Sequence, residues 1–216
     1  MSQLTHHSVV FLMGPTASGK TDLAIELSKH FKTRLISVDS ALIYQGMDIG
    51  TAKPDSDTLQ KHPHHLIDIC TAEESYSAYD FAKDAKLQIE MAFANNELPI
   101  LVGGTSFYFN ALEHGLSNLP ESSEQSKQKF NQLLEEKGSA VLHQELQKID
   151  PQAANRIHPN DAQRITRALE VFDLSGKTLS ELQGNKQPVL DCPIKKIILM
   201  PDRALLHQRI ESRFVN

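Results

Sequence analysis

The feature that most constrains this chain is a glycine-rich loop near its amino terminus. The loop reads as a glycine, four further residues and then Gly-Lys-Thr, and it consists of Gly14, Pro15, Thr16, Ala17, Ser18, Gly19, Lys20 and Thr21. Its glycines let backbone N–H groups turn inward, and Lys20 adds a positive charge. Thr21 can bind Mg²⁺ or a phosphate oxygen. The pattern predicts a loop that binds a diphosphate or triphosphate.

The segments around the loop alternate between strand and helix patterns. Short apolar runs predict strands at residues 9–13, 34–39, 98–104 and 195–200. Apolar residues at helical spacing predict helices at residues 20–31 and 78–95 and from Asp202 onward. Such alternation favours a parallel sheet covered on both faces, with ligands at the carboxyl ends of the strands. The predicted fold class is therefore α/β, a P-loop NTPase-like parallel sheet covered by helices.

Three segments divide the chain. Residues 1–120 are predicted to form the first part of the P-loop core, and residues 189–216 return to it with a strand and the start of a helix. Between them, residues 121–188 contain long polar helix patterns without a convincing strand, which we interpret as a helical insertion domain. The last helix has no stop signal by Asn216, so we expect a fragment of a longer protein.

Composition and charge exclude several classes of protein. Apolar residues make up 40% of the chain, and no run approaches the roughly 18 apolar residues of a membrane span. The amino terminus lacks a secretory signal and the two cysteines lie far apart, so we expect a cytoplasmic protein. We also expect a monomer. A net charge of −5 argues against indiscriminate coating of nucleic acid. Residues 1–120 carry 8 basic and 14 acidic side chains and residues 121–200 carry 11 of each, so the basic residues are concentrated late.

The motif by itself does not identify the molecule whose phosphates are bound. An NTPase usually has a second apolar strand that ends in a Mg²⁺-binding acid, but the strand predicted at residues 98–104 ends in glycines. Asp39 is the one acid at the end of a predicted strand. It can serve as an outer ligand of Mg²⁺ or as a general base, and both roles stay open. The histidines at residues 62–65 do not indicate a zinc site, because no second ligand cluster accompanies them.

Four blocks of sequence together resemble one family. They are GPTASGKT, LISVDSALIYQGMDIGTAKP, ILVGGTSFYFNAL and RIHPNDAQRITRALEVFDLSGKTLSEL. Their order and approximate spacing resemble those of the tRNA dimethylallyltransferases, also called isopentenylpyrophosphate transferases. The resemblance extends from Val9 to Phe214 and lacks the family's C-terminal portion.

The resemblance implies transfer of a prenyl group to RNA. The loop would bind dimethylallyl diphosphate instead of ATP, with Mg²⁺ as a helper, and diphosphate would be the leaving group. The acceptor would be the N6 amine of the adenine just 3′ of the anticodon, in the anticodon stem-loop of a tRNA. Asp39 matches the position of the general base for this amine, and Thr105 matches a residue near the reacting adenine.

The resemblance also implies two sets of binding residues. The diphosphate would be bound by the loop, with Thr16 to Thr21 as the matching segment, and by Arg213. The implied tRNA contacts are Asp39, Ser40, Ala41, Leu42, Thr105, Gln163, Arg164, Ile165, Thr166 and Arg167. From the residues alone, Lys127 in the insertion is a candidate for contact with the RNA backbone, against the default of a basic surface helix. Of the aromatic run at residues 107–109, at least two side chains are expected in the core.

Two other functions stay open at this stage. A P-loop kinase of a small metabolite would bind ATP at the same loop and use Asp39 as a base for a hydroxyl group. The sequence lacks an obvious arginine-rich lid segment, which disfavours a kinase. A non-catalytic RNA-binding protein would carry the loop as a remnant, and the intact Gly19-Lys20-Thr21 disfavours that interpretation.

Overall fold

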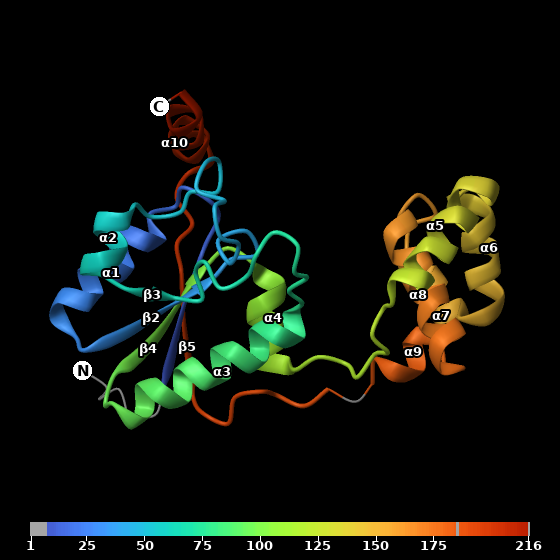
Figure 1. Cartoon of the computed structure of the whole chain (residues 1–216), viewed down its shortest axis with the longest axis horizontal. Helices are drawn as coiled ribbons and strands as arrows, with labels where there is room; N and C mark the ends of the chain where they lie inside the picture. Colours follow the sequence, from blue (N-terminus) through green and yellow to red (C-terminus); the bar gives the residue numbers. More distant parts are fainter. Residues whose placement is uncertain (1–7, 185, 216) are drawn as a thin grey trace. The chain divides into compact units, whose positions relative to one another are not determined.

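The structure is a computed structural model that describes residues 8–184 and 186–215, with the side chains of residues 213–215 left out. Two compact units make up the chain. Unit 1 comprises Met1–Gly115 and Pro188–Asn216, and unit 2 comprises Leu116–Gln187 (Figure 1). Unit 2 therefore interrupts unit 1 in the sequence, and it contains most of the segment in which the sequence predicts only helices.

A parallel sheet forms the centre of unit 1. Within the described residues its strands are β1 (Val9–Met13), β2 (Thr33–Val38), β3 (His64–His65), β4 (Leu98–Gly103) and β5 (Ile194–Ile198), in the spatial order β3-β2-β4-β1-β5. Each pair of neighbouring strands is parallel. The predicted α/β class is confirmed, and four of these strands match the predicted apolar runs to within two residues at either end.

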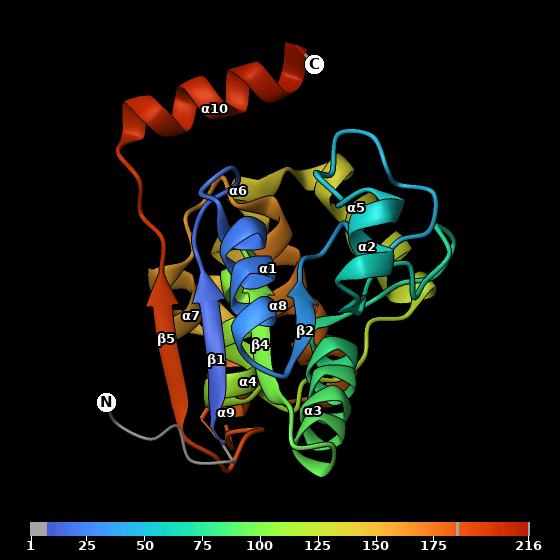
Figure 2. The same cartoon turned by 90° about the vertical axis from the view of Figure 1, so that its left-hand side faces the viewer.

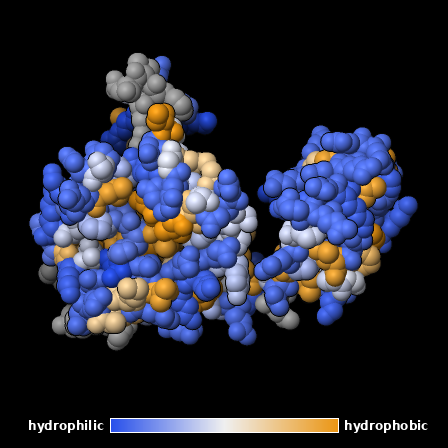
Figure 3. All heavy atoms as spheres, viewed as in Figure 1, coloured by the Kyte–Doolittle hydropathy of each residue, from blue (hydrophilic) through white to orange (hydrophobic). Residues whose placement is uncertain are grey.

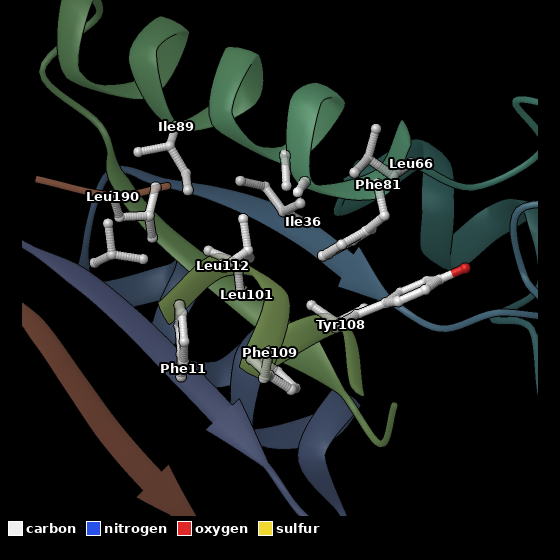
Figure 4. Packing of buried hydrophobic residues seen from close by; sticks show 14 residues of the cluster. Phe11, Ile36, Leu66, Phe81, Ile89, Leu101, Tyr108, Phe109, Leu112 and Leu190 are labelled. Atoms are coloured by element: carbon white, nitrogen blue, oxygen red, sulfur yellow. The ribbon is translucent and has the colours of Figure 1, made fainter. Parts of the chain in front are cut away.

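Helices pack on both faces of this sheet. The helices of unit 1 are α1 (Lys20–His30), α2 (Ser56–Lys61), α3 (Ala78–Ala94), α4 (Ser106–His114) and α10 (Arg203–Val215). Because side chains alternate along a strand, Phe11 and Leu101 lie on one face, where they pack with residues of α3 and α4 (Figure 4). Val10 and Ile100 lie on the other face with Ala24 of α1. Burial on both faces explains why β1 and β4 read as continuous apolar runs, whereas β5 at the edge of the sheet is mostly exposed.

The carboxyl ends of four strands meet at one edge of the sheet. Strand pairing places their last or nearly last residues in one row, which consists of Val38, Gly103, Met13 and Ile198. Figure 2 shows β1, β2 and β5 pointing toward this edge, with α10 beyond it. Asp39 follows β2 directly, and the glycine-rich loop follows β1. The sheet therefore brings to one edge the two features that the sequence singled out.

Gly103 is required at this edge because two backbones approach each other closely. A Cβ atom at Gly103 would lie 2.0 Å from the carbonyl oxygen of Val38 and 2.6 Å from its carbonyl carbon. Backbone atoms of a central strand cannot move aside as the end of a flexible side chain can.

We expect Gly103→Ala to lower the free energy of unfolding by about 1–3 kcal/mol or more, because the added methyl group overpacks the contact between β2 and β4. Urea titration followed by circular dichroism measures the change. The matched control is Gly184→Ala, whose added Cβ would meet its nearest neighbour at 4.0 Å. Equal stability of the two variants would contradict the prediction.

The segment between β2 and α3 contains two short elements that the sequence analysis did not predict. These are α2, capped by Asp55, whose side chain accepts a hydrogen bond from the Thr58 N–H, and the two-residue strand β3. His64 of β3 is half-buried, and its Nδ1 lies 2.8 Å from the carbonyl oxygen of His62. Burial lowers the pKa of His64. The histidines thus lie in and beside an edge strand of the sheet.

The described part of unit 2 consists of helices. They are α5 (Glu124–Lys137), α6 (Ser139–Ile149), α7 (Pro151–Arg156), α8 (Ala162–Ser175) and α9 (Leu179–Leu182). Leu142 of α6 and Ile165 and Val171 of α8 are fully buried in the core of this unit. Gly138 separates α5 from α6 with φ of 78°, and Pro151 begins α7. Unit 2 therefore has a hydrophobic core of its own.

The surface is polar over most of its visible area. Figure 3 shows each unit largely hydrophilic on the side that faces the viewer, with scattered apolar patches. Among the described residues, no helix is long and apolar enough to cross a membrane.

Phe107 is 61% exposed, whereas Tyr108 and Phe109 are buried, so the expectation that at least two of the three aromatic residues lie in the core is confirmed.

Candidate functional site

The glycine-rich loop turns directly from β1 into the first turn of α1. Gly19 is the N-cap of α1 and has φ of 90°, a left-handed conformation that disfavours side chains. Ala17, at the tip of the loop, also has a positive φ, of 62°. A left-handed alanine costs about 1–2 kcal/mol, and such strain is concentrated at functional sites. The loop presents the amino-terminal end of a helix, which attracts anions.

Lys20 and Ser18 make the polar side-chain contacts inside the loop. The Lys20 ammonium donates to the Pro15 carbonyl at 2.6 Å and to Ser18 Oγ at 3.3 Å. Ser18 is buried, with 7% of its surface exposed. The ammonium group therefore lies within the curve of the loop.

A cavity of about 720 Å³ opens over the loop. Four parts of unit 1 line it: the loop with the start of α1, the residues after β2, the end of β4, and a segment leading into α2, with one residue of α10 in addition. The lining residues are Thr16, Ala17, Ser18, Gly19, Lys20, Thr21, Asp22, Ile25, Asp39, Leu42, Thr51, Ala52, Lys53, Pro54, Asp55, Thr58, Val102, Gly103, Gly104 and Arg209. Asp39 and the predicted diphosphate segment thus share one cavity, as the sequence indicated.

Asp39 is held in one orientation by its own backbone. Its Oδ1 accepts hydrogen bonds from the N–H groups of Ala41 at 2.8 Å and of Leu42 at 3.3 Å. Within residues 8–184 and 186–215, no side chain or backbone group donates to Oδ2. One oxygen therefore fixes the carboxylate, and the other is available to accept a proton or a hydrogen bond from a bound molecule.

The other residues expected near Asp39 lie around it in different ways. Leu42 lines the cavity, whereas Ser40 is exposed and Ala41 is half-buried. Thr105 is the N-cap of α4, and its N–H donates to the carbonyl of Val38, the residue before Asp39. Its side chain makes no capping hydrogen bond. The hydroxyl group of Thr105 is therefore not used to start α4, unlike the common role of a threonine at this position.

Two cations that line the cavity were missed by the sequence analysis. Arg209 of α10 donates to the Ala17 carbonyl at 3.4 Å, one helical turn before Arg213. The side chain of Arg213, the predicted diphosphate ligand, lies outside the described residues. Arg209 could have been found from the sequence by its spacing, because it lies four residues before the predicted ligand Arg213. Lys53 also lines the cavity; it lies in the second of the four blocks that carry the family resemblance, but nothing within that block singled it out.

The predicted tRNA contacts of unit 2 differ in accessibility. Gln163 and Arg164 are exposed on α8, and Arg164 forms an ion pair with Asp161 at 2.7 Å. Thr166 is half-buried, and its hydroxyl donates to the carbonyl of Ala162 at 2.9 Å. In α5, Lys127 is exposed and pairs with Glu124.

Two predicted tRNA contacts in α8, Ile165 and Arg167, have side chains that are engaged within unit 2. The side chain of Ile165 is 0% exposed in the core of unit 2, so the predicted contact of this side chain with RNA is wrong for this conformation. Arg167 is bound within its own unit, to the buried carboxylate of Glu170 and to the Pro120 carbonyl at 2.7 Å. Arg167 thus ties the start of unit 2 to α8.

Comparison with known proteins identifies the family. The model of the IPP transferase family matches residues 42–216. A curated relative from Ruthia magnifica subsp. Calyptogena magnifica, named tRNA dimethylallyltransferase, is 76% identical over 209 residues. The match covers 97% of this chain and 68% of that relative. The chain belongs to the IPP transferase family.

Solved structures of similar proteins agree with this family. The full-length tRNA isopentenylpyrophosphate transferase of Bacillus halodurans is 38% identical, with a TM-score of 0.60. The match covers 96% of this chain and 64% of that one. A eukaryotic dimethylallyltransferase described as acting on tRNA is 29% identical, with a TM-score of 0.77, and the match covers 96% of this chain and 52% of that one. The present chain thus spans between half and two thirds of these solved family members.

Proposed function

We propose that this chain supplies the donor site and the general base of a tRNA dimethylallyltransferase. The reaction transfers a dimethylallyl group from dimethylallyl diphosphate to the N6 amine of the adenine 3′ of the anticodon, and releases diphosphate. One observation carries the proposal: in a member of the IPP transferase family, Asp39 and the loop segment Thr16 to Thr21 line the same cavity.

The loop suits a diphosphate leaving group. When the C–O bond of the donor breaks, negative charge develops on the diphosphate, and preorganised donors lower the barrier by stabilising that charge. Lys20, the backbone N–H groups at the start of α1 and the guanidinium of Arg209 line the cavity where this charge would develop. These groups bind the donor by its inorganic end and leave the five-carbon group directed away from the loop.

Asp39 suits the acceptor side of the reaction. The lone pair of adenine N6 is delocalised into the ring, so a carboxylate that accepts the amine proton makes N6 a better nucleophile. As the new C–N bond forms, the proton passes from N6 to Oδ2 of Asp39, the oxygen that the backbone leaves available. The bond electrons of the broken C–O bond leave with the diphosphate.

Magnesium fits the residues that line the cavity. Mg²⁺ is usually bound by one or two protein oxygens together with phosphate oxygens and water. The Thr21 hydroxyl group supplies one such oxygen, and the described residues hold no cluster of three or more His, Cys, Asp or Glu side chains that would bind a metal without a substrate. The ion would neutralise charge on the diphosphate.

The tRNA must present its adenine outside the stacked anticodon loop to reach this cavity. Enzymes that modify a base turn it out of the stack into a pocket. Exposed polar residues of unit 2, such as Gln163 and Arg164, are candidates for contacts with the RNA backbone. We propose that these exposed residues of unit 2 contact the tRNA.

The experiment incubates the full-length protein with unmodified tRNA, Mg²⁺ and dimethylallyl diphosphate labelled in the five-carbon group, without ATP. Label that enters the tRNA supports the proposal. Transfer of the γ-phosphate of labelled ATP to a small molecule, with no label in the tRNA, would instead support a kinase. Each relative described above is named as a tRNA prenyltransferase, so we expect the first result.

A further inference from the structure

One wall of the cavity is formed by a loop that has no regular secondary structure. This wall loop consists of residues 45–55, between β2 and α2, and its cavity-lining residues are Thr51, Ala52, Lys53, Pro54 and Asp55. Gly46 and Gly50 have positive φ values, and so does Ala52, with φ of 68°. A loop with this backbone needs tertiary contacts to hold one conformation.

Lys53 provides those contacts. Its ammonium lies 2.5 Å from Asp68 Oδ1 and 2.7 Å from Asp48 Oδ1, and it donates to the Tyr44 carbonyl at 3.2 Å. The side chain of Lys53 is 5% exposed, whereas that of Asp48 is 68% exposed. An ammonium group has three N–H donors. All three are therefore used by groups of unit 1.

The same contacts connect the wall loop to the segment that carries Asp39. Asp68 N–H donates to the Leu42 carbonyl at 3.1 Å, and the Asp68 carbonyl accepts from Gln45 Nε2 at 3.1 Å. Leu42 N–H in turn donates to Asp39 Oδ1. Lys53, Asp68 and Leu42 thus form a chain of hydrogen bonds from the wall loop to the carboxylate of Asp39.

Lys53 remains charged in this environment. Burial by itself lowers the pKa of Lys53, but the hydrogen bonds and negative charges of Asp48 and Asp68 outweigh burial and place that pKa above its ordinary value. Removing either the buried ammonium or its carboxylate partners alone is costly, because the charge that remains is left without compensation.

We propose that Lys53 is a positioning residue for the diphosphate donor: it fixes the wall loop, which lines the same cavity as the glycine-rich loop, without contacting the phosphates itself. The inference rests on the proposed function for the identity of the donor. It assigns part of the donor affinity to a residue outside the glycine-rich loop. With Lys53 in place, Thr51 and Asp55 stay in the wall of the cavity that the glycine-rich loop also lines.

The test measures the Kd of inorganic diphosphate with Mg²⁺ by isothermal titration calorimetry, for the wild type and for three variants. We expect Lys53→Met and the double variant Asp48→Asn/Asp68→Asn each to raise the Kd roughly tenfold or more, because each releases the wall loop. Lys53→Arg retains the charge and is expected to stay closer to the wild-type Kd. The control is Lys29→Met, since Lys29 is a surface lysine that pairs with Glu26 outside the cavity.

The double variant separates positioning from direct phosphate binding. If Lys53 bound the diphosphate directly, removal of its two carboxylate partners would free the ammonium and strengthen binding, and this result would overturn the proposal. Unchanged affinity in Lys53→Met would overturn it too. If Lys53→Met fails to fold, Asp48→Asn alone decides, because the side chain of Asp48 is mostly exposed and packs in no core.

Two further measurements distinguish positioning from a general loss of structure. Hydrogen exchange is expected to increase in residues 45–53 of Lys53→Met and to stay unchanged in α3. In the transfer assay, the KM for the donor should rise while kcat stays within about twofold. If the wild type transferred no prenyl group, the proposed function would fail, yet diphosphate affinity and hydrogen exchange would still test the role of Lys53.

Discussion

Replacement of Lys20 with alanine is expected to lower kcat/KM for dimethylallyl transfer by about 100-fold or more, because the variant loses the cavity-lining ammonium that we propose as a ligand of the diphosphate. The loss of one preorganised donor to a developing negative charge typically costs two to three orders of magnitude in rate. The affinity for inorganic diphosphate should fall as well, since the same ammonium meets the ground-state diphosphate. Steady-state kinetics with labelled donor, together with calorimetry, measure both effects.

Lys20 also donates hydrogen bonds to groups of its own loop, so its replacement can change the stability of the loop as well as donor binding. Its ammonium donates to the Pro15 carbonyl and to Ser18 Oγ, and these acceptors lose a partner in the variant. Thermal unfolding checks that the fold persists. Lys29→Ala, which removes a lysine from the exposed side of α1, serves as the control and should keep its activity. A Lys20→Ala variant with wild-type kcat/KM would show that the loop does not bind the donor.

Replacement of Asp39 with asparagine is expected to lower kcat by about 10²- to 10⁴-fold, the usual contribution of a positioned general base. Asparagine keeps an oxygen that can accept from the N–H groups of Ala41 and Leu42, so the turn after β2 is preserved. The side-chain amide cannot accept the amine proton. Single-turnover kinetics with saturating donor and tRNA measure the transfer step itself.

The same variant decides between the two roles that the sequence left open for Asp39. If Asp39 is the base, kcat falls and the Kd of diphosphate with Mg²⁺ stays within about threefold of the wild type. If Asp39 is an outer ligand of Mg²⁺, diphosphate affinity falls and excess Mg²⁺ restores part of the activity. Asp57→Asn, on the exposed side of α2, is the control and should leave both quantities unchanged.

Much of the fold could be predicted from sequence because its elements bury long apolar runs. The strand at Val9–Met13 is a continuous apolar run that ends at a glycine, and the helix at Ala78–Ala94 repeats its apolar positions at helical spacing over several turns. The strand β3 and the helix α2 have too few residues to show a period. Their positions depend on tertiary pairing, with β3 on β2.

The candidate site was predictable only where it is local in sequence. The loop is a continuous motif, and Asp39 follows a strong strand pattern, so both were found. Lys53 reaches the cavity wall through partners at Asp48 and Asp68, a relation that spacing alone does not reveal. The family resemblance implied residues 163–167 as one contact segment, but in a helix neighbouring side chains point in different directions, and that of Ile165 lies in the core of unit 2.

The interruption of unit 1 by unit 2 has a consequence for biosynthesis. β1 pairs with β5 along a register that joins Val10 to Lys195, so the sheet remains incomplete on that side until residues 194–198 have left the ribosome. Unit 2 is contiguous and helical, with contacts that are close in sequence, and such modules fold fast. During translation the N–H and C=O groups of β1 on the side of β5 therefore stay unpaired for a time. Such a strand edge can pair with other nascent chains.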